Sequence, residues 1–374
     1  MAGIYLHIPF CRQACHYCNF HFSTSLHRKN DFVGALLKEM EARKDYIAGA
    51  PVDTVYFGGG TPSLLSEDEL ARILDRLHAL FPISPNAEIT LEANPDDMAA
   101  QQSLESWKQR GINRLSIGVQ SFFDEDLRWM NRVHNAAQAA DSIRRAQDAG
   151  LENISIDLIY GTPGLTDSRW EKNVALALDL SIPHLSCYAL TVEPRTALDK
   201  MIRQHKKADV SPDDQARQFL LLVDWLHSAG YEHYEISNFS LPGHRSRHNT
   251  SYWQGKPYLG LGPSAHSYDG VSTREWNAAN NAQYIDASPL PPSEKELLSP
   301  TQQLNEYIMI SLRTMEGADL AYVSERFGAD KADVLQRQSA RYIREGSLTG
   351  TNGRLILSRE GKLLADGIAA DLFF

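Results

Sequence analysis

The sequence is poor in cysteine, with four in 374 residues, and it has neither an excess of positive charge nor a long apolar run. The formal net charge of −10 does not favour binding to nucleic acid, which is a polyanion. Because no run of about 18 apolar residues occurs, we expect no membrane span and at most peripheral membrane contact. The first residues lack a basic segment followed by an apolar one, so we expect no signal peptide and a cytoplasmic location.

Short apolar, β-branched runs alternate with longer amphipathic segments up to about residue 236. This alternation predicts parallel strands joined by helical crossovers, and six such units predict an incomplete (β/α)6-type barrel within an α/β fold. One predicted helix opens with Ser66 followed by Glu69, which is the signature of a capping box. The predicted strands are 4–8, 53–57, 88–92, 114–119, 154–159 and 185–190, with 233–237 as a seventh candidate.

The pattern changes after the barrel, so we divide the chain into a barrel at 1–236, a covering segment at 237–300 and a C-terminal domain at 301–374. The covering segment is rich in Gly, Pro, Asn and aromatic residues, and 287–300 is typical of a linker or extended loop. The last part predicts helices followed by a hairpin around Asn352-Gly353, which indicates a small winged-helix-like α+β domain. It carries 9 Lys/Arg against 10 Asp/Glu, so DNA binding is not expected.

Three of the four cysteines lie within eight positions, directly after the first predicted strand. In parallel barrels the loops that follow the strands form the active site. Cys11, Cys15 and Cys18 suit a [4Fe–4S] cluster in which one iron has no protein ligand, although clusters usually take four cysteines. Two alternatives stay open on spacing alone: three unrelated thiols, and a structural zinc site that takes its fourth ligand from His7, His16 or His21.

Polar and glycine-rich positions follow the other predicted strands. The run GGGTP at 58–62 would let backbone groups approach a ligand closely, although a tight turn without a ligand explains it equally well. Glu92, Gln120 and Asp157 lie at or within strand ends, where a buried carboxylate needs a partner. Several such groups on one rim predict a shared polar ligand.

Five segments together resemble the radical S-adenosylmethionine (SAM) superfamily, and more narrowly the group that holds oxygen-independent coproporphyrinogen III oxidases and haem chaperones. These segments are YLHIPFCRQACHYCNF, VYFGGGTPSLL, ITLEANPDD, RLSIGVQSF and ISIDLIYGTPG. The resemblance runs from about residue 4 to 270, and the C-terminal part also fits. It implies that Cys11, Cys15 and Cys18 hold three irons of a [4Fe–4S] cluster, and that SAM chelates the fourth.

The resemblance also implies contacts between individual residues and SAM. Tyr5 would lie near the cluster, and Tyr17 would stack near the adenine. Glu92 would bind the ammonium of SAM, and Arg132 would pair with its carboxylate. The remaining implied contacts are Gly59, Gly60 and Thr61 at the methionine part, with Gln120 and Asp157 on the ribose side.

Two departures separate this sequence from the oxidases. The oxidases resemble C-x3-C-x2-C-x-C, and Phe20 stands at the position of the fourth cysteine. The oxidases also carry a long segment before the first strand, whereas the first predicted strand here begins at Ile4. Instead, the resemblance extends to an H-N-x-x-Y-W motif formed by His248, Asn249, Tyr252 and Trp253. It implies a haem site in which His248 offers a nitrogen to iron and the two aromatic residues cover the porphyrin.

On this resemblance we expect a haem chaperone that binds a [4Fe–4S] cluster, SAM and haem, and transfers haem to acceptor haemoproteins such as respiratory enzymes. Two other classes stay open. One is a SAM-radical enzyme that acts on a porphyrin, including coproporphyrinogen III dehydrogenase. The other is a zinc-stabilised binding module, if no iron–sulfur cluster forms.

Overall fold

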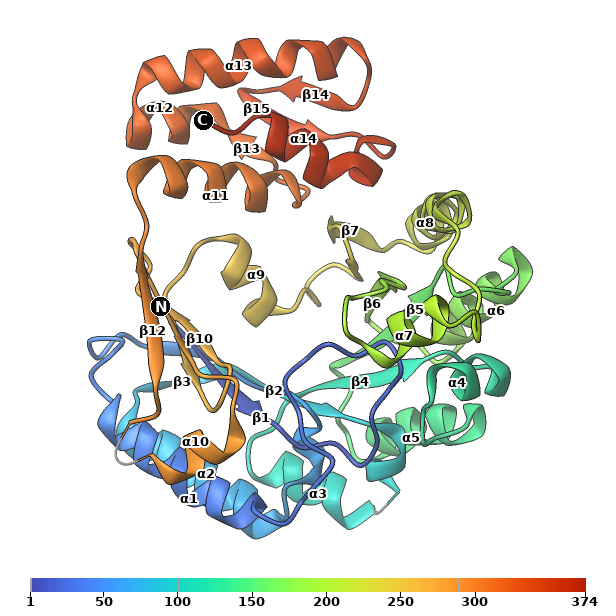
Figure 1. Ribbon diagram of the computed structural model, residues 1–374, viewed down its shortest axis with the longest axis vertical. Helices are drawn as coiled ribbons and strands as arrows, with labels where there is room; N and C mark the ends of the chain where they lie inside the picture. The colour runs from blue at the N-terminus through green and yellow to red at the C-terminus, as the bar shows by residue number, and fades with distance from the viewer. Residues whose placement is uncertain (1, 100, 288–289) are drawn as a thin grey trace.

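A computed structural model describes residues 2–99, 101–287 and 290–374. The six predicted barrel strands are present, and each pairs in parallel with the next along the chain (Figure 1). This confirms the partial parallel barrel. The strands are β1 (Ala2–Ile8), β2 (Val52–Gly59), β3 (Ile83–Ala93), β4 (Arg114–Gln120), β5 (Ile154–Tyr160) and β6 (His184–Ala189).

The crossover helices pack apolar faces against this sheet, and α1, α2, α3 and α5 lie along one side of it in Figure 1. The predicted capping box is present, because Ser66 accepts from the Glu69 amide and Glu69 accepts from the Ser66 amide. The helices are α1 (Lys29–Ala42), α2 (Glu67–Leu80), α3 (Gln101–Gln109), α4 (Asp124–Met130), α5 (Ala136–Asp148), α6 (Asp167–Asp179), α7 (Ala197–Arg203) and α8 (Pro212–Ser228).

The seventh candidate strand is not a further parallel unit. It forms β7 (Glu232–Glu235), which turns back into β8 (Asn238–Ser240). β8 then pairs antiparallel with β6, so the parallel series ends there. The turn between the two strands holds only two residues, which leaves no length for a helical crossover.

Part of the predicted covering segment (237–300) extends the sheet from its other edge. β9 (Tyr258–Leu261) pairs in parallel with β1, and β10 (His266–Tyr268), β11 (Thr273–Asn277) and β12 (Ser293–Leu297) continue antiparallel. The predicted linker is therefore wrong at 293–297, and its residues 288–289 lie outside the described residues. Two helices belong to this segment, α9 (Arg247–Trp253) and α10 (Asn281–Asp286).

A buried carboxylate on α1 ties this extension to the barrel. Glu39 accepts hydrogen bonds from the Gly262 amide at 2.8 Å, Asn277 Nδ2 at 2.7 Å and the Tyr284 hydroxyl at 2.6 Å. Arg43, one turn along the same helix, lies 3.6 Å from the carboxylate. Burial raises the pKa of Glu39 and these hydrogen bonds oppose that rise, so removal of its partners would be strongly destabilising.

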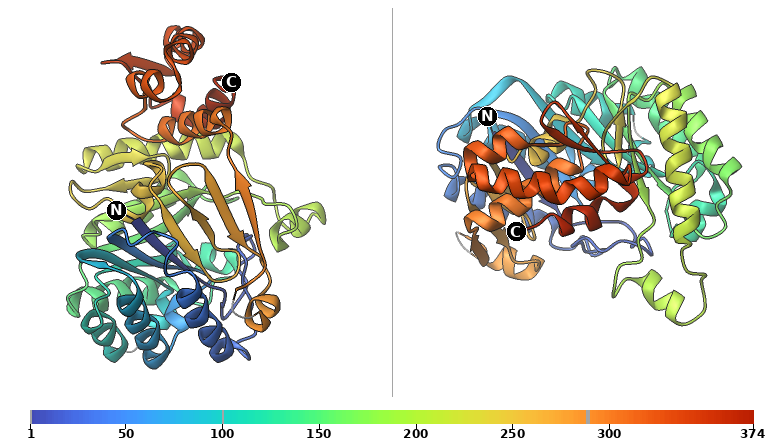
Figure 2. Two further views of the ribbon diagram at one scale, coloured as in Figure 1. Left: turned by 90° about the vertical axis from the view of Figure 1, so that its left-hand side faces the viewer. Right: turned by 90° about the horizontal axis from the view of Figure 1, so that it is seen from above.

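The C-terminal elements form their own apolar core above the sheet (Figure 2). The expected hairpin is present, since β14 pairs antiparallel with β15 and Asn352 and Gly353 both have positive φ. None of the helices in the described ranges combines the length and apolarity that a membrane span requires. The elements are α11 (Pro300–Leu312), β13 (Ala318–Asp319), α12 (Leu320–Phe327), α13 (Ala329–Arg344), β14 (Leu348–Thr351), β15 (Arg354–Leu357) and α14 (Ala365–Asp371).

Candidate cluster, SAM and haem sites

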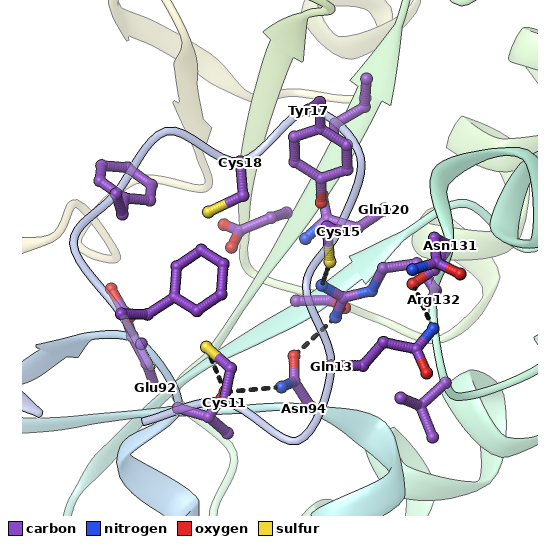
Figure 3. A pocket seen from close by; sticks show the side chains of 18 of the residues that line it. Cys11, Gln13, Cys15, Tyr17, Cys18, Glu92, Asn94, Gln120, Asn131 and Arg132 are labelled. Atoms are coloured by element: carbon purple, nitrogen blue, oxygen red, sulfur yellow. Dashed lines mark hydrogen bonds between the residues drawn. The ribbon is translucent and has the colours of Figure 1, made fainter. Parts of the chain in front are cut away.

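The loop after β1 places all three clustered cysteines on one cavity of about 440 Å³, which we call the cysteine cavity (Figure 3). The carboxyl ends of β2 to β6 supply most of the remaining wall, as expected for a parallel barrel. Predicted residues that line this cavity are Cys11, Cys15, Tyr17, Cys18, Gly59, Gly60, Thr61, Glu92, Gln120, Arg132 and Asp157.

Backbone and side-chain contacts fasten the cysteine loop to its neighbours. The His16 amide donates to the Met130 carbonyl at 3.1 Å, and the Leu198 amide of α7 donates to the His16 carbonyl at 2.8 Å. Asn131 Nδ2 donates to the Ala14 carbonyl at 2.7 Å. The loop is therefore held from α4 on one side and from α7 on the other.

Two of the cysteines are held by specific polar neighbours. The Thr61 hydroxyl lies 3.5 Å from Cys11 Sγ, and the Arg132 guanidinium lies 3.3 Å from Cys15 Sγ. Burial raises the pKa of Cys11 to about 11 and also raises that of Cys18. Iron binding at these thiols would therefore release protons, because thiolate is the ligand form.

Asn94 links Thr61 to Arg132, and it is not among the site residues predicted from the sequence. Its Nδ2 donates to the Thr61 hydroxyl at 3.0 Å, and its Oδ1 accepts from Arg132 at 2.6 Å (Figure 3). Arg132 also donates to the Gly118 carbonyl at 2.7 Å. The available signal was the position of Asn94 directly after a strand and before Pro95, at the same rim as the predicted residues.

Two half-buried carboxylates, Glu92 and Asp157, face the cavity without a cationic partner in direct contact among the described residues. Burial raises the pKa of Glu92 to about 7, although the Tyr56 hydroxyl donates to it at 2.8 Å. Burial likewise raises the pKa of Asp157 to about 6. A positive charge or hydroxyl donors on a ligand would stabilise the ionised carboxylates and so compensate for their lost hydration. These residues therefore fit a ligand with an ammonium group and a sugar.

Backbone geometry at two strand ends also suits a ligand site. Gly59 has φ +101°, and a Cβ added there would lie 2.6 Å from the His7 ring. Gln120 is not glycine but has φ +66°, where β4 loses register with β5. Such strain is common at functional sites, where the surrounding structure supports it.

The three histidines that the sequence offers to a zinc ion make other contacts. His7 Nε2 lies 2.8 Å from the His21 carbonyl oxygen, and His21 Nε2 lies 2.6 Å from Asn281 Oδ1. His16 Nδ1 lies 3.0 Å from the Trp129 carbonyl oxygen. Across residues 2–99, 101–287 and 290–374, no three His, Cys, Asp or Glu side chains gather around a position for one metal ion.

A second cavity of about 880 Å³ lies between the sheet extension, α9 and the C-terminal helices α11 and α12. We call it the aromatic cavity, since its lining includes Tyr252, Trp253, Tyr258, Tyr268, Tyr307, Tyr322 and Phe327. Tyr5 also lines this second cavity and not the cysteine cavity, which differs from its expected place. Asn19 and Phe20 line both cavities, so the end of the cysteine loop separates them.

The four residues of the H-N-x-x-Y-W motif divide between two environments. Tyr252 and Trp253 line the aromatic cavity, but His248 and Asn249 do not. His248 is buried, with Nδ1 2.8 Å from the Thr54 hydroxyl and Nε2 2.8 Å from the Tyr252 hydroxyl. Both ring nitrogens are therefore engaged, so iron binding by His248 stays a prediction and would require the loss of one of these two contacts. The Asn249 amide donates to Ser246, the N-cap of α9.

Comparisons with known proteins agree with the fold. The family model of the Radical SAM superfamily matches residues 5–177, and that of the HemN C-terminal domain matches 298–364. The fold is shared with the structure titled "Coproporphyrinogen III oxidase (HemN) from Escherichia coli is a Radical SAM enzyme", at a TM-score of 0.85 and 23% identity. That match covers 100% of this chain and 90% of the other. Together these features define a radical SAM protein.

Curated relatives narrow the family. The chain is 32% identical to "Heme chaperone HemW" of Bacillus subtilis over 373 residues, covering 98% of each chain. It is 35% identical to the protein of that name from Mycobacterium tuberculosis (strain H37Rv), covering 99% of this chain and 94% of the other. The Escherichia coli relative is 32% identical, covering 98% and 96%. The chain belongs to the HemW family of the radical SAM superfamily.

Proposed function

We propose that this chain is a cytoplasmic haem chaperone, which holds a [4Fe–4S] cluster with SAM in the cysteine cavity and haem in the aromatic cavity. It would transfer haem to acceptor haemoproteins. The observation that carries this proposal is the position of the aromatic cavity directly beside the cysteine loop. The name of its relatives, heme chaperone, supports the same assignment.

In the cysteine cavity, Cys11, Cys15 and Cys18 would hold the cluster, and Thr61 and Arg132 would support the first two of these thiolates. Glu92 would bind the SAM ammonium through a charge-assisted bond in a buried site. A bound cluster and SAM together supply one-electron chemistry. The protein's part is to keep the thiols, the carboxylate and the guanidinium oriented and shielded from water.

Tyr17, Gly59, Gly60, Gln120 and Asp157 would complete the SAM site. Tyr17 packs beside an apolar cluster that includes Met130 and Ile159, so its ring is held in place at the cavity wall. Asp157 would accept from ribose hydroxyls, and the glycines would let the backbone approach the methionine part.

In the aromatic cavity, Tyr252 and Trp253 would cover the porphyrin, which is large, flat and apolar. The volume of about 880 Å³ lies within the range of about 300–1,000 Å³ that is usual for ligand cavities. Lys256 and Arg326 also line it and would attract the haem propionates, whereas Arg274 is paired with Glu306, which lines the same cavity. His248 would position Tyr252 through its hydrogen bond.

The test uses protein whose cluster has been rebuilt without oxygen. Haem is titrated into it while the absorption spectrum is followed, and coproporphyrinogen III is then added with SAM and a reductant. One-to-one haem binding without porphyrinogen turnover is the expected result. Formation of protoporphyrinogen with weak haem binding would establish the alternative, a SAM-radical enzyme that acts on a porphyrin.

A further inference from the structure

The engagement of both nitrogens of His248 leaves open which side chain binds the haem iron. Three other histidines line the aromatic cavity: His7, His21 and His266. His7 is buried, with Nε2 at the His21 carbonyl and Nδ1 3.3 Å from the Tyr5 hydroxyl. His21 Nε2 contacts Asn281. Both nitrogens of His7 and Nε2 of His21 are therefore already in contact with other groups, whereas Nδ1 of His21 has no such contact among the described residues.

His266 differs from the other two in its contacts. Its ring stacks on Trp276 of the neighbouring strand, with ring centres 5.7 Å apart and 22° between the planes. Its side chain is exposed, and its imidazole makes no hydrogen bond to another side chain or backbone group in the part of the chain that the structure describes. Stacking on Trp276 restricts the plane of the ring, while both of its nitrogens stay available to a ligand in the cavity.

The charge around His266 suits both a neutral ligand and an anionic haem. Although the side chain is exposed, partial desolvation and the nearby Arg274 lower the pKa of His266, which favours the neutral ring with a free lone pair. Arg274 is paired with Glu306 at 2.7 Å. Lys256 and Arg326, in contrast, have no carboxylate partner within 4.0 Å among the described residues, so both remain available to propionates.

From the stacked ring, its free nitrogens and the cationic lining, we propose that His266 is the axial ligand of haem iron in the aromatic cavity. This inference rests on the proposed haem-binding function and names the ligand within it. His266 would supply an imidazole nitrogen lone pair to the haem iron. No electron is transferred, and no proton is needed in this step.

The test compares haem titrations of the full-length, cluster-loaded protein with those of His266→Ala and a matched control, His244→Ala. His244 is exposed and does not line the aromatic cavity. We expect His266→Ala to bind ferric haem about tenfold more weakly and to lose the low-spin, imidazole-ligated signature in absorption and electron paramagnetic resonance spectra. Added imidazole should restore that signature, and His244→Ala should match the parent protein.

The possible outcomes separate this inference from the function on which it rests. If the parent protein binds haem and His266→Ala keeps the same spectrum and affinity, the ligand assignment is wrong and the chaperone proposal stands. A tyrosinate-type spectrum in the parent protein would also overturn the assignment. If the parent protein does not bind haem, the proposed function itself fails. An unchanged iron–sulfur spectrum in His266→Ala verifies that the variant is folded.

Discussion

The cysteine cavity and the aromatic cavity share the end of one loop, but they are built in different ways. The first lies at the carboxyl ends of parallel strands and contains half-buried thiols, carboxylates and an arginine. The second lies between short strands, α9 and the C-terminal helices, and its lining is mainly aromatic. The first therefore suits a charged ligand and a metal cluster, and the second a flat apolar ligand with charged edges.

The largest expected effect is at the cysteine cavity. Cys15→Ala should reduce bound iron and sulfide at least about tenfold, because two thiolates cannot replace three protein ligands. Chemical iron and sulfide analysis after anaerobic reconstitution measures this. Cys187→Ala is the matched control: Cys187 is a core thiol with 2% of its surface exposed, and its loss should leave the cluster intact. Equal iron content in both variants would show that Cys15 is not a ligand of the cluster.

The next effect concerns Glu92. Glu92→Gln should weaken SAM binding about 100-fold, because loss of one partner of a buried charge pair costs about 2–5 kcal/mol. Isothermal titration of cluster-loaded protein with SAM measures the affinity. Glu88→Gln is the control from the same strand; Glu88 is also buried but accepts from the Arg247 and His248 amides. A similar loss in both variants would indicate a general effect on β3.

The pKa of Glu92 gives a smaller effect with a defined direction. With a pKa of about 7, Glu92 is mostly ionised at pH 8 and mostly protonated at pH 6. SAM affinity should therefore fall about tenfold from pH 8 to pH 6, since the ammonium needs the carboxylate. The raised pKa also means that SAM-free protein loses stability as pH rises from about 4.5 to about 7. A flat affinity profile that Glu92→Gln leaves unchanged would contradict this role.

The smallest effect is expected in the aromatic cavity, where several rings share the contact. Trp253→Ala should weaken haem binding about five- to tenfold, because one stacked ring contributes about 1 kcal/mol. SAM affinity and iron content should stay unchanged. Trp129→Ala is the control, because Trp129 contacts Lys207 and lines neither cavity. If Trp253→Ala instead reduced SAM binding, the separation of the two cavities would be wrong.

Sequence reasoning succeeded where local chemistry and regular alternation carry the information. Alternating β and α segments predicted the parallel strands, and the strand ends then predicted that Glu92, Gln120 and Asp157 share a rim. The sheet extension was missed because its strands are only three to five residues long, and β9 pairs with a strand about 250 residues earlier. Such distant pairing leaves no periodic signal in the sequence.

The surroundings of His248 could not be predicted from the sequence for a related reason. A sequence motif identifies which residues are adjacent on α9, but it does not identify what surrounds each face of the helix. His248 faces Thr54 of β2, whereas Tyr252 and Trp253 reach the aromatic cavity. The contact between His248 and Thr54 joins residues 194 positions apart, so only the folded chain reveals it.

The shared wall of Asn19 and Phe20 has a thermodynamic consequence. Phe20 is 68% exposed and lines both cavities, so the position of this segment affects the shape of each. Binding equilibria coupled through one segment are reciprocal: if cluster assembly tightens haem binding by some factor, haem must tighten cluster retention by that same factor. Binding of either cofactor would then change the affinity for the other, even though the two cofactors do not touch.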